Sequence, residues 1–128
     1  MAIKLGNTPK TFKKIPVKFT MPDGEAGAIA VVFKYRSRSG YGAYLNELFN
    51  SAETEQPVDE DAKRDFVAIF AKGGEKAIEK LLAEMESWDF GYELNKETLM
   101  QMQDEFPASI AALGEAFRAA CVEGKLGT

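Results

Sequence analysis

A proline within an otherwise continuous helical pattern limits what the carboxyl-terminal third of this chain can form. Apolar residues recur at spacings of three and four on both sides of Pro107, which is the period of a helix with one buried face. Proline lacks a backbone donor and disfavours helical geometry at the preceding residue, Phe106. Because proline is also well suited to the first position of a helix, the pattern predicts two helices that meet at an angle.

The first helix of this pair has a clear predicted start, and the second a clear predicted end. Asn95 can cap the first helix, and Leu94 and Leu99 are spaced as the two members of a hydrophobic staple. Gly124 is expected to end the second helix, with Cys121 on its apolar face. As the only cysteine of the chain, Cys121 is expected to be a buried core thiol.

The amino-terminal third has the alternating pattern of a β-hairpin. Across residues 11–36, apolar residues occupy the odd positions of two runs, and turn-forming residues 22–24 separate them. Pro16 restricts the first strand to an edge of the sheet. Residues 1–10 are expected to form a flexible arm. Since a lone hairpin is marginal in water, helices or another subunit should cover its apolar face.

Three further helices are predicted between the hairpin and the helix pair. The first begins near Tyr41 and ends before an acidic loop, and the second begins at a cap formed by Asp59 and ends at Gly73. The third extends to Met85. We therefore expect an α+β fold dominated by helix, in which an amino-terminal hairpin packs with about five helices of residues 41–123.

Length and composition are consistent with a single domain over residues 1–128. A chain of this length with 45% hydrophobic residues can build one core. It contains no apolar run near the ~20 residues that span a bilayer, and residues 1–10 lack the apolar segment of a secretion signal. We therefore expect a protein that stays in the cytoplasm and has no membrane partner.

Charge is divided unequally along the sequence. The first 40 residues contain eight Lys and Arg against two acids, whereas the remainder contains eight against eighteen. A basic segment of this kind can bind nucleic acid, or it can pair with the acidic half of its own chain or of a neighbouring copy. The net charge of −4 favours the second alternative, because the chain as a whole does not attract a phosphate backbone. The candidate self-association residues are Lys13, Lys14, Lys18, Arg36 and Arg38.

Arrangements that would indicate catalysis are missing from the sequence. It has no histidine, which excludes Ser-His and Cys-His pairs and the usual His-containing zinc sites. Gly73 and Gly74 lack the remaining residues of a phosphate-binding loop. Neighbouring acids such as Asp104 and Glu105 are expected to be solvated. We therefore expect a binding protein that is not an enzyme and needs no cofactor or metal.

Trp88, Phe90 and Tyr92 form an aromatic cluster in a predicted loop. Exposed, these side chains would form a partner site, since Trp and Tyr are enriched among binding hot spots. Packed, they would close the end of a small helical core, which is the more common situation for Trp. The sequence favours the packed arrangement and leaves the exposed one open.

Several of these features together resemble the tail assembly chaperones of long-tailed bacteriophages. They are Trp88 with the acidic residue after it, a loop, a short helix, the Asp-Glu-Phe-Pro step at residues 104–107, a helix rich in small residues and a Gly-containing tail. The likeness continues upstream, where the hairpin ends in Phe33, Lys34, Tyr35, Arg36 and Arg38. The resemblance thus covers most of the chain.

The resemblance implies a protein that self-associates and holds the long, helical tape measure protein until tail tube subunits polymerise around it. The expected partners are the tape measure protein, further copies of this chain and, as an additional candidate, the tail tube protein. Such a chaperone would act in the host cytoplasm and would be absent from the mature virion. Apolar residues that a small domain leaves incompletely covered are the candidate partner contacts: Phe49, Phe66, Phe70, Trp88, Phe90 and Tyr92.

A nucleic-acid-binding or regulatory domain is the alternative. It would use the basic hairpin together with the two helices around Pro107, in the manner of a helix-turn-helix. A recognition helix needs several polar or basic side chains to contact base edges. In the segment from Ala108 to Arg118, only Arg118 is basic, which argues against this alternative.

Overall fold

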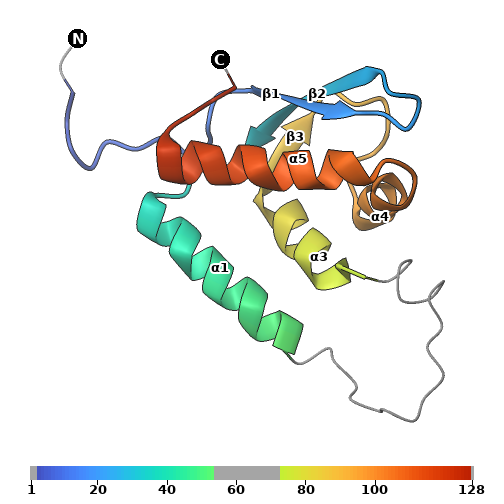
Figure 1. The fold of residues 1–128 in the computed structure, drawn as a ribbon. Helices are drawn as coiled ribbons and strands as arrows, with labels where there is room; N and C mark the ends of the chain where they lie inside the picture. Colours follow the sequence, from blue (N-terminus) through green and yellow to red (C-terminus); the bar gives the residue numbers. More distant parts are fainter. Residues whose placement is uncertain (1–2, 54–72, 128) are drawn as a thin grey trace.

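The computed structural model describes residues 3–53 and 73–127, with side chains omitted at 50–53. Over these ranges the fold is α+β, with a three-stranded antiparallel sheet and four α-helices (Figure 1). The elements are β1 (Ile15–Thr20), β2 (Ala26–Phe33), α1 (Arg38–Glu53), α3 (Glu75–Glu84), β3 (Met85–Trp88), α4 (Lys96–Glu105), α5 (Pro107–Arg118) and the π-helical turn η1 (Ala119–Glu123).

The predicted hairpin is confirmed as β1 and β2. Ile15 lies opposite Val31 and Val17 opposite Ile29, and all four side chains are buried because odd positions share one face of the sheet. β1 is an edge strand in the order β1-β2-β3. This position accommodates Pro16, as predicted.

The third strand, β3, was not predicted, because Met85 was assigned to a helix and Trp88 to a loop. The helical spacing of the preceding apolar residues continues to Met85, and no Gly or Pro interrupts it. Glu86 and Ser87 are adjacent and both exposed, so β3 lacks the alternation typical of a strand. Pairing with β2 determines the strand instead, since Val31 lies opposite Trp88. Asp89 extends the pairing because its carboxylate accepts a hydrogen bond from the Ala30 amide at 2.8 Å.

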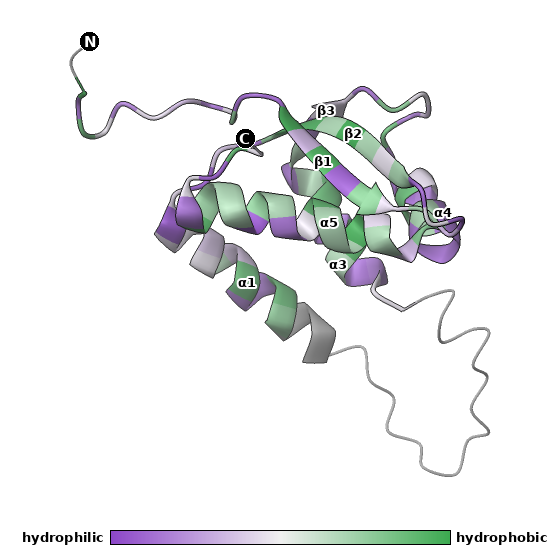
Figure 2. Cartoon of the chain, turned by 45° about the horizontal axis from the view of Figure 1, so that its top comes forward, coloured by the Kyte–Doolittle hydropathy of each residue, from purple (hydrophilic) through white to green (hydrophobic). Residues whose placement is uncertain are grey.

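Helix α5 lies along the sheet and supplies the centre of the core (Figure 1). Leu113 and Phe117 are buried, and the Phe117 ring lies 5.2 Å from that of Phe33 on β2 and 5.4 Å from that of Tyr44 on α1. In Figure 2, β2 and much of α5 are hydrophobic, whereas α4 is mostly hydrophilic. One apolar layer therefore joins the sheet to the helices.

The predicted corner at Pro107 and the cap at Asn95 are confirmed. The Asn95 side chain accepts a hydrogen bond from the Thr98 amide at 2.8 Å. Phe106 lies between α4 and α5 with a non-helical backbone, φ −131° and ψ 71°. The buried Ser109 hydroxyl donates to the Phe106 carbonyl at 2.7 Å, which fixes the corner. Gly124, in the left-handed region at φ 68°, follows η1, as expected for the helix end.

Helix α1 begins earlier than the predicted start at Tyr41. The Ser37 hydroxyl accepts a hydrogen bond from the Gly40 amide at 3.1 Å, so Ser37 provides the cap that the sequence analysis did not assign. The helix predicted between Asp59 and Gly73 lies outside the described residues. Within the described ranges, no helix is long and apolar enough to cross a membrane.

Candidate partner-binding groove

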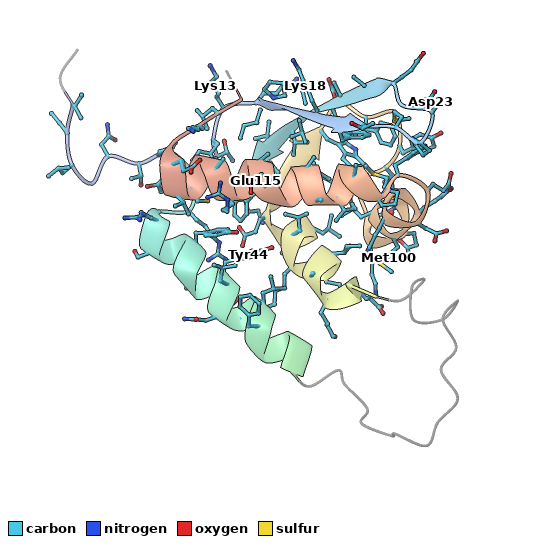
Figure 3. All side chains as sticks on the ribbon, viewed as in Figure 1. Lys13, Lys18, Asp23, Tyr44, Met100 and Glu115 are labelled. Atoms are coloured by element: carbon cyan, nitrogen blue, oxygen red, sulfur yellow. The ribbon has the colours of Figure 1, made fainter. Side chains whose placement is uncertain are left out.

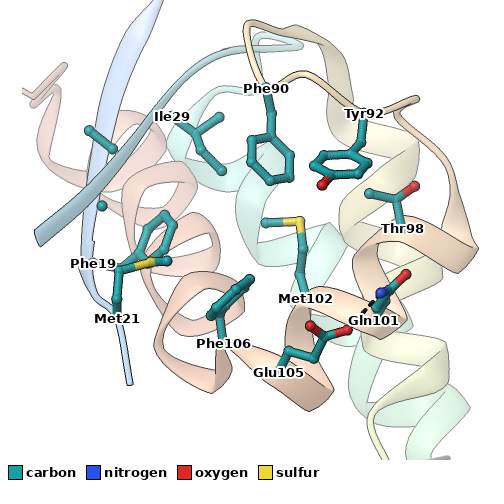
Figure 4. Close-up of a pocket in the computed structure, with 12 residues that line it drawn as sticks. Phe19, Met21, Ile29, Phe90, Tyr92, Thr98, Gln101, Met102, Glu105 and Phe106 are labelled. Atoms are coloured by element: carbon teal, nitrogen blue, oxygen red, sulfur yellow. Dashed lines mark hydrogen bonds between the residues drawn. The ribbon is translucent and has the colours of Figure 1, made fainter. Parts of the chain in front are cut away.

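An apolar groove of about 380 Å³ lies between the hairpin tip, the loop after β3 and helix α4 (Figure 4). We call it the hairpin–α4 groove. Its lining comprises Phe19, Met21, Gly27, Ala28, Ile29, Phe90, Tyr92, Thr98, Gln101, Met102, Glu105 and Phe106.

The groove exists because the apolar face of the hairpin extends beyond its helical cover. Ile15 and Val17 are 1% and 3% exposed, whereas Phe19 and Met21, further along the same face, are only half-buried. Gly27 on β2 opens the space beside them. A Cβ at this position would lie 2.9 Å from the Phe19 ring and 3.0 Å from the Met21 sulfur. A larger residue would therefore displace the floor of the groove.

The Phe90 and Tyr92 rings form one wall of the groove, and Trp88 packs behind them. The Trp88 and Phe90 rings meet edge to face with centroids 5.4 Å apart, and Phe90 and Tyr92 follow at 4.8 Å. The Trp88 indole donates to the Tyr92 carbonyl at 2.9 Å, which holds the loop in place. Trp88 and Phe90 are half-buried, whereas Tyr92 is 66% exposed. The cluster thus combines the two predicted arrangements: Trp88 braces the loop, and Phe90 and Tyr92 face the groove.

The rim of the groove is polar and acidic. Thr98, Gln101 and Glu105 line the side formed by α4, and the Gln101 amide donates to the exposed Glu105 carboxylate at 2.6 Å. Glu105 is the only residue of the lining with a formal charge at neutral pH. On the hairpin side, the turn after Met21 carries the exposed Asp23, which Figure 3 shows at the tip. An apolar ligand with adjacent positive charge would complement this site.

The predicted basic residues differ in their availability. Lys13, Lys14, Lys18 and Arg38 are exposed, and Lys13 and Lys18 point away from the helices (Figure 3). Arg36 instead contacts its own chain. Its Nε donates to the Glu84 carboxylate at 2.8 Å, and its guanidinium lies 5.7 Å from the centre of the Tyr44 ring.

Burial shifts the ionisation of two groups near this ion pair. Burial of the Tyr44 phenol raises its pKa to about 12, and burial of the Cys121 thiol raises its pKa to about 11. The predicted core position of Cys121 is confirmed, and a protonated thiol at neutral pH is a poor nucleophile. Among the described residues, no cluster of three or more acidic or cysteine side chains could hold a metal ion.

The structure brings together only part of the predicted partner-binding set. Phe90 and Tyr92 line the groove and Trp88 packs behind them, whereas Phe49 is 62% exposed on α1, outside the lining. Phe66 and Phe70 lie outside the described residues. Six apolar lining residues were not predicted as contacts: Phe19, Met21, Ala28, Ile29, Met102 and Phe106. The available signals were the alternation that continues past Val17 and the aromatic residue at the Pro107 corner.

Comparison with known proteins supplies the family. No curated protein and no solved structure matches the chain. A protein-family model described as "Phage tail assembly chaperone" matches residues 1–128, the whole chain. The resemblance noted in the sequence is thereby confirmed, and the chain belongs to the phage tail assembly chaperone family.

Proposed function

We propose that this protein binds the tape measure protein of its phage and keeps it soluble in the host cytoplasm while the tail tube assembles. The observation that carries the proposal is the hairpin–α4 groove, an apolar site with an acidic rim on a chain of this family. Its activity is contact and not catalysis. The chaperone leaves before the virion is complete, and the tail tube protein is a further candidate partner.

The chemistry of the groove fits one face of an amphipathic helix. Such helices bind grooves through apolar anchors spaced three or four residues apart. Phe19, Met102 and Phe106 offer apolar contacts for the anchors. The Glu105 carboxylate would pair with a Lys or Arg beside them. A helix of the tape measure protein that awaits its tube would have such a face unpartnered.

We also propose that copies of the chain self-associate. The exposed basic residues Lys13, Lys14, Lys18 and Arg38 are available for contacts between copies, and the acidic residues of the other elements offer the opposite charge. Contacts of this kind would weaken at high salt because exposed charges are screened.

The helix-turn-helix alternative is not favoured by the geometry. Leu113 and Phe117 of α5 are buried against the rest of the protein, so this face of the helix is not free for a DNA groove. Its single basic residue, Arg118, is paired with Glu115 and Glu123. The hydrogen bond to Glu115 raises the pKa of Arg118, which therefore stays charged but already has a partner.

Co-expression with the tape measure protein tests the proposal, and two exposed aromatic residues provide a matched comparison. Tyr92 in the groove is 66% exposed and Phe49 on α1 is 62% exposed, so Ala at either site should leave the fold intact. We expect Tyr92→Ala, and more strongly Gln101→Trp, which fills the groove, to reduce the amount of soluble tape measure protein that co-purifies. Phe49→Ala should leave it unchanged.

Two outcomes would contradict this proposal. Failure of the folded wild-type protein to co-purify with the tape measure protein would show that the client is wrong. If Phe49→Ala reduced capture and both groove variants did not, the client would bind elsewhere on the chaperone. Circular dichroism of each purified variant would verify that it is folded.

A further inference from the structure

We infer that the amino-terminal arm of one copy docks in the hairpin–α4 groove of a second copy, which makes the groove the site of self-association. This inference rests on the self-association proposed above and identifies its contact. It assigns a role to residues 3–10, which belong to the segment predicted to be a flexible arm.

The arm presents apolar side chains that its own chain does not cover. Ile3 and Leu5 are 95% and 101% exposed. They are two of only four large hydrophobic residues exposed in the described part of the protein, and a third, Tyr92, stands at the groove. A short segment with two fully exposed aliphatic side chains suits a partner that offers an apolar site.

The charges of the arm and groove are complementary. Lys4 lies between the two aliphatic residues, and the groove lining carries the Glu105 carboxylate as its formal charge. A lysine stem is long enough to place its ammonium at a rim while the neighbouring side chains occupy the floor. The groove volume of about 380 Å³ falls within the range of sites that take small ligands, roughly 300–1,000 Å³.

The arm is too short to place both of its anchors, Ile3 and Leu5, in the groove of its own chain. It is attached to the sheet at Lys10, whose carbonyl accepts from the Tyr35 amide at 3.0 Å, just beyond the end of β2. The groove lies at the start of β2, where Ala28 is part of its lining. Ala28 is seven residues before Tyr35, which corresponds to roughly 24 Å along a strand. The five residues from Lys10 to Leu5 span at most about 18 Å, so Leu5 cannot reach the groove of its own chain. In Figures 1 and 2 the arm also points away from α4.

An arm that leaves one end of a protomer and enters the opposite end of the next makes a head-to-tail contact. Contacts of this type join different surfaces of the two copies, so they generate a ring if the rotation closes and a filament if it does not. Each internal copy uses both its arm and its groove.

Sedimentation velocity of full-length variants tests this inference. Ile3→Asp with Leu5→Asp removes the arm anchors, and Gln101→Trp with Glu105→Lys fills the groove and reverses its charge. Each pair should weaken association by about tenfold or more, since two apolar anchors are lost or excluded. The matched control, Ala43→Asp with Asn46→Asp, adds two negative charges at exposed positions of α1, outside both surfaces, and should retain the wild-type assembly. Lys13→Glu with Lys14→Glu tests the alternative in which basic residues near the hairpin form the contact between copies.

Mixing the two variants gives a result that other models do not predict. The arm variant retains its groove and the groove variant retains its arm, so the mixture should form dimers and no larger species. Lys4→Glu combined with Glu105→Lys should recover association that either reversal alone reduces.

The outcomes separate this inference from the proposed function. Oligomers of wild-type size that persist in both variants, or that dissociate only when Lys13 and Lys14 are replaced, would overturn arm docking while self-association stands. If the groove variant lost binding of the tape measure protein but kept oligomers of wild-type size, the groove would bind only the client. This result would also overturn arm docking. A wild-type protein that is monomeric at every concentration would contradict self-association itself.

Discussion

The ion pair between Arg36 and Glu84 provides a stability test whose result depends on which partner is removed. Arg36 follows β2, and Glu84 ends α3, where its backbone carbonyl also accepts from the Lys34 amide at 2.7 Å. The two side chains differ in burial, because that of Arg36 is 29% exposed and that of Glu84 only 8%. Removing one partner leaves the other charge in its native surroundings.

The difference in burial gives the expected magnitudes. Arg36→Met leaves a carboxylate almost without access to water, so the free energy of unfolding should fall by about 3–5 kcal/mol, as for other broken buried pairs. Glu84→Leu leaves a guanidinium that can reach water, and the expected loss is smaller, about 2 kcal/mol. The double variant Arg36→Met, Glu84→Leu contains no unpaired charge and should be more stable than Arg36→Met alone.

Urea unfolding followed by circular dichroism would measure the four free energies of a double-mutant cycle. Arg118→Met is the matched control, because it breaks an exposed pair with Glu115 and should change stability little. Additive single effects, or a greater loss from Glu84→Leu than from Arg36→Met, would refute the reasoning. If Arg36→Met kept wild-type stability but lost self-association, Arg36 would act between copies, as the sequence analysis expected.

Three local features give further predictions. Asn95→Ala should lower stability by about 1 kcal/mol in urea unfolding, whereas Asn95→Asp, which retains a capping oxygen, should change it much less. Leu99→Ala should lower stability by about 2–5 kcal/mol, because the Leu99 side chain on α4 is fully buried. In alkaline solution the folded state loses stability as pH rises from about 10 to about 12, since the unfolded chain ionises Tyr44 first; Tyr44→Phe should reduce this loss.

The sequence predicted those parts of the fold that depend on neighbouring residues. Alternation fixed the faces of β1 and β2, Asn95 predicted a helix start, and Pro107 predicted the corner, because each acts within a few residues of itself. Strand β3 escaped prediction because its conformation depends on pairing with β2, more than 50 residues earlier. The strand propensities of the four residues of β3 could not reveal that partner.

The groove could be predicted only in part for the same reason. Trp88, Phe90 and Tyr92 were visible as a cluster because they lie close in sequence. Their relation to Phe19 and Phe106 arises only when the hairpin and α4 are folded against the same core. An apolar residue of the hairpin belongs to the core only where helices cover it. Val17 is buried and Phe19 is half-buried, so the helical cover ends between these two residues.

Use of one groove by both the arm and the client has a measurable consequence. A site that is occupied by an arm must release it before a client helix can bind, so the apparent affinity for the client falls by the fraction of grooves that are occupied. Client binding should then break head-to-tail contacts, because the arm and the client helix compete for the same groove.

A titration with a helical fragment of the tape measure protein tests this competition. Sedimentation of the wild-type chaperone should show progressively smaller assemblies as the fragment is added. The arm variant Ile3→Asp, Leu5→Asp keeps its groove empty, and should bind the same fragment more tightly than the wild type does at concentrations where the wild type is assembled. At concentrations low enough to separate the wild-type copies, the two affinities should converge. Equal affinities at high concentration, with assemblies that keep their size as they take up the fragment, would show that client and arm use different surfaces.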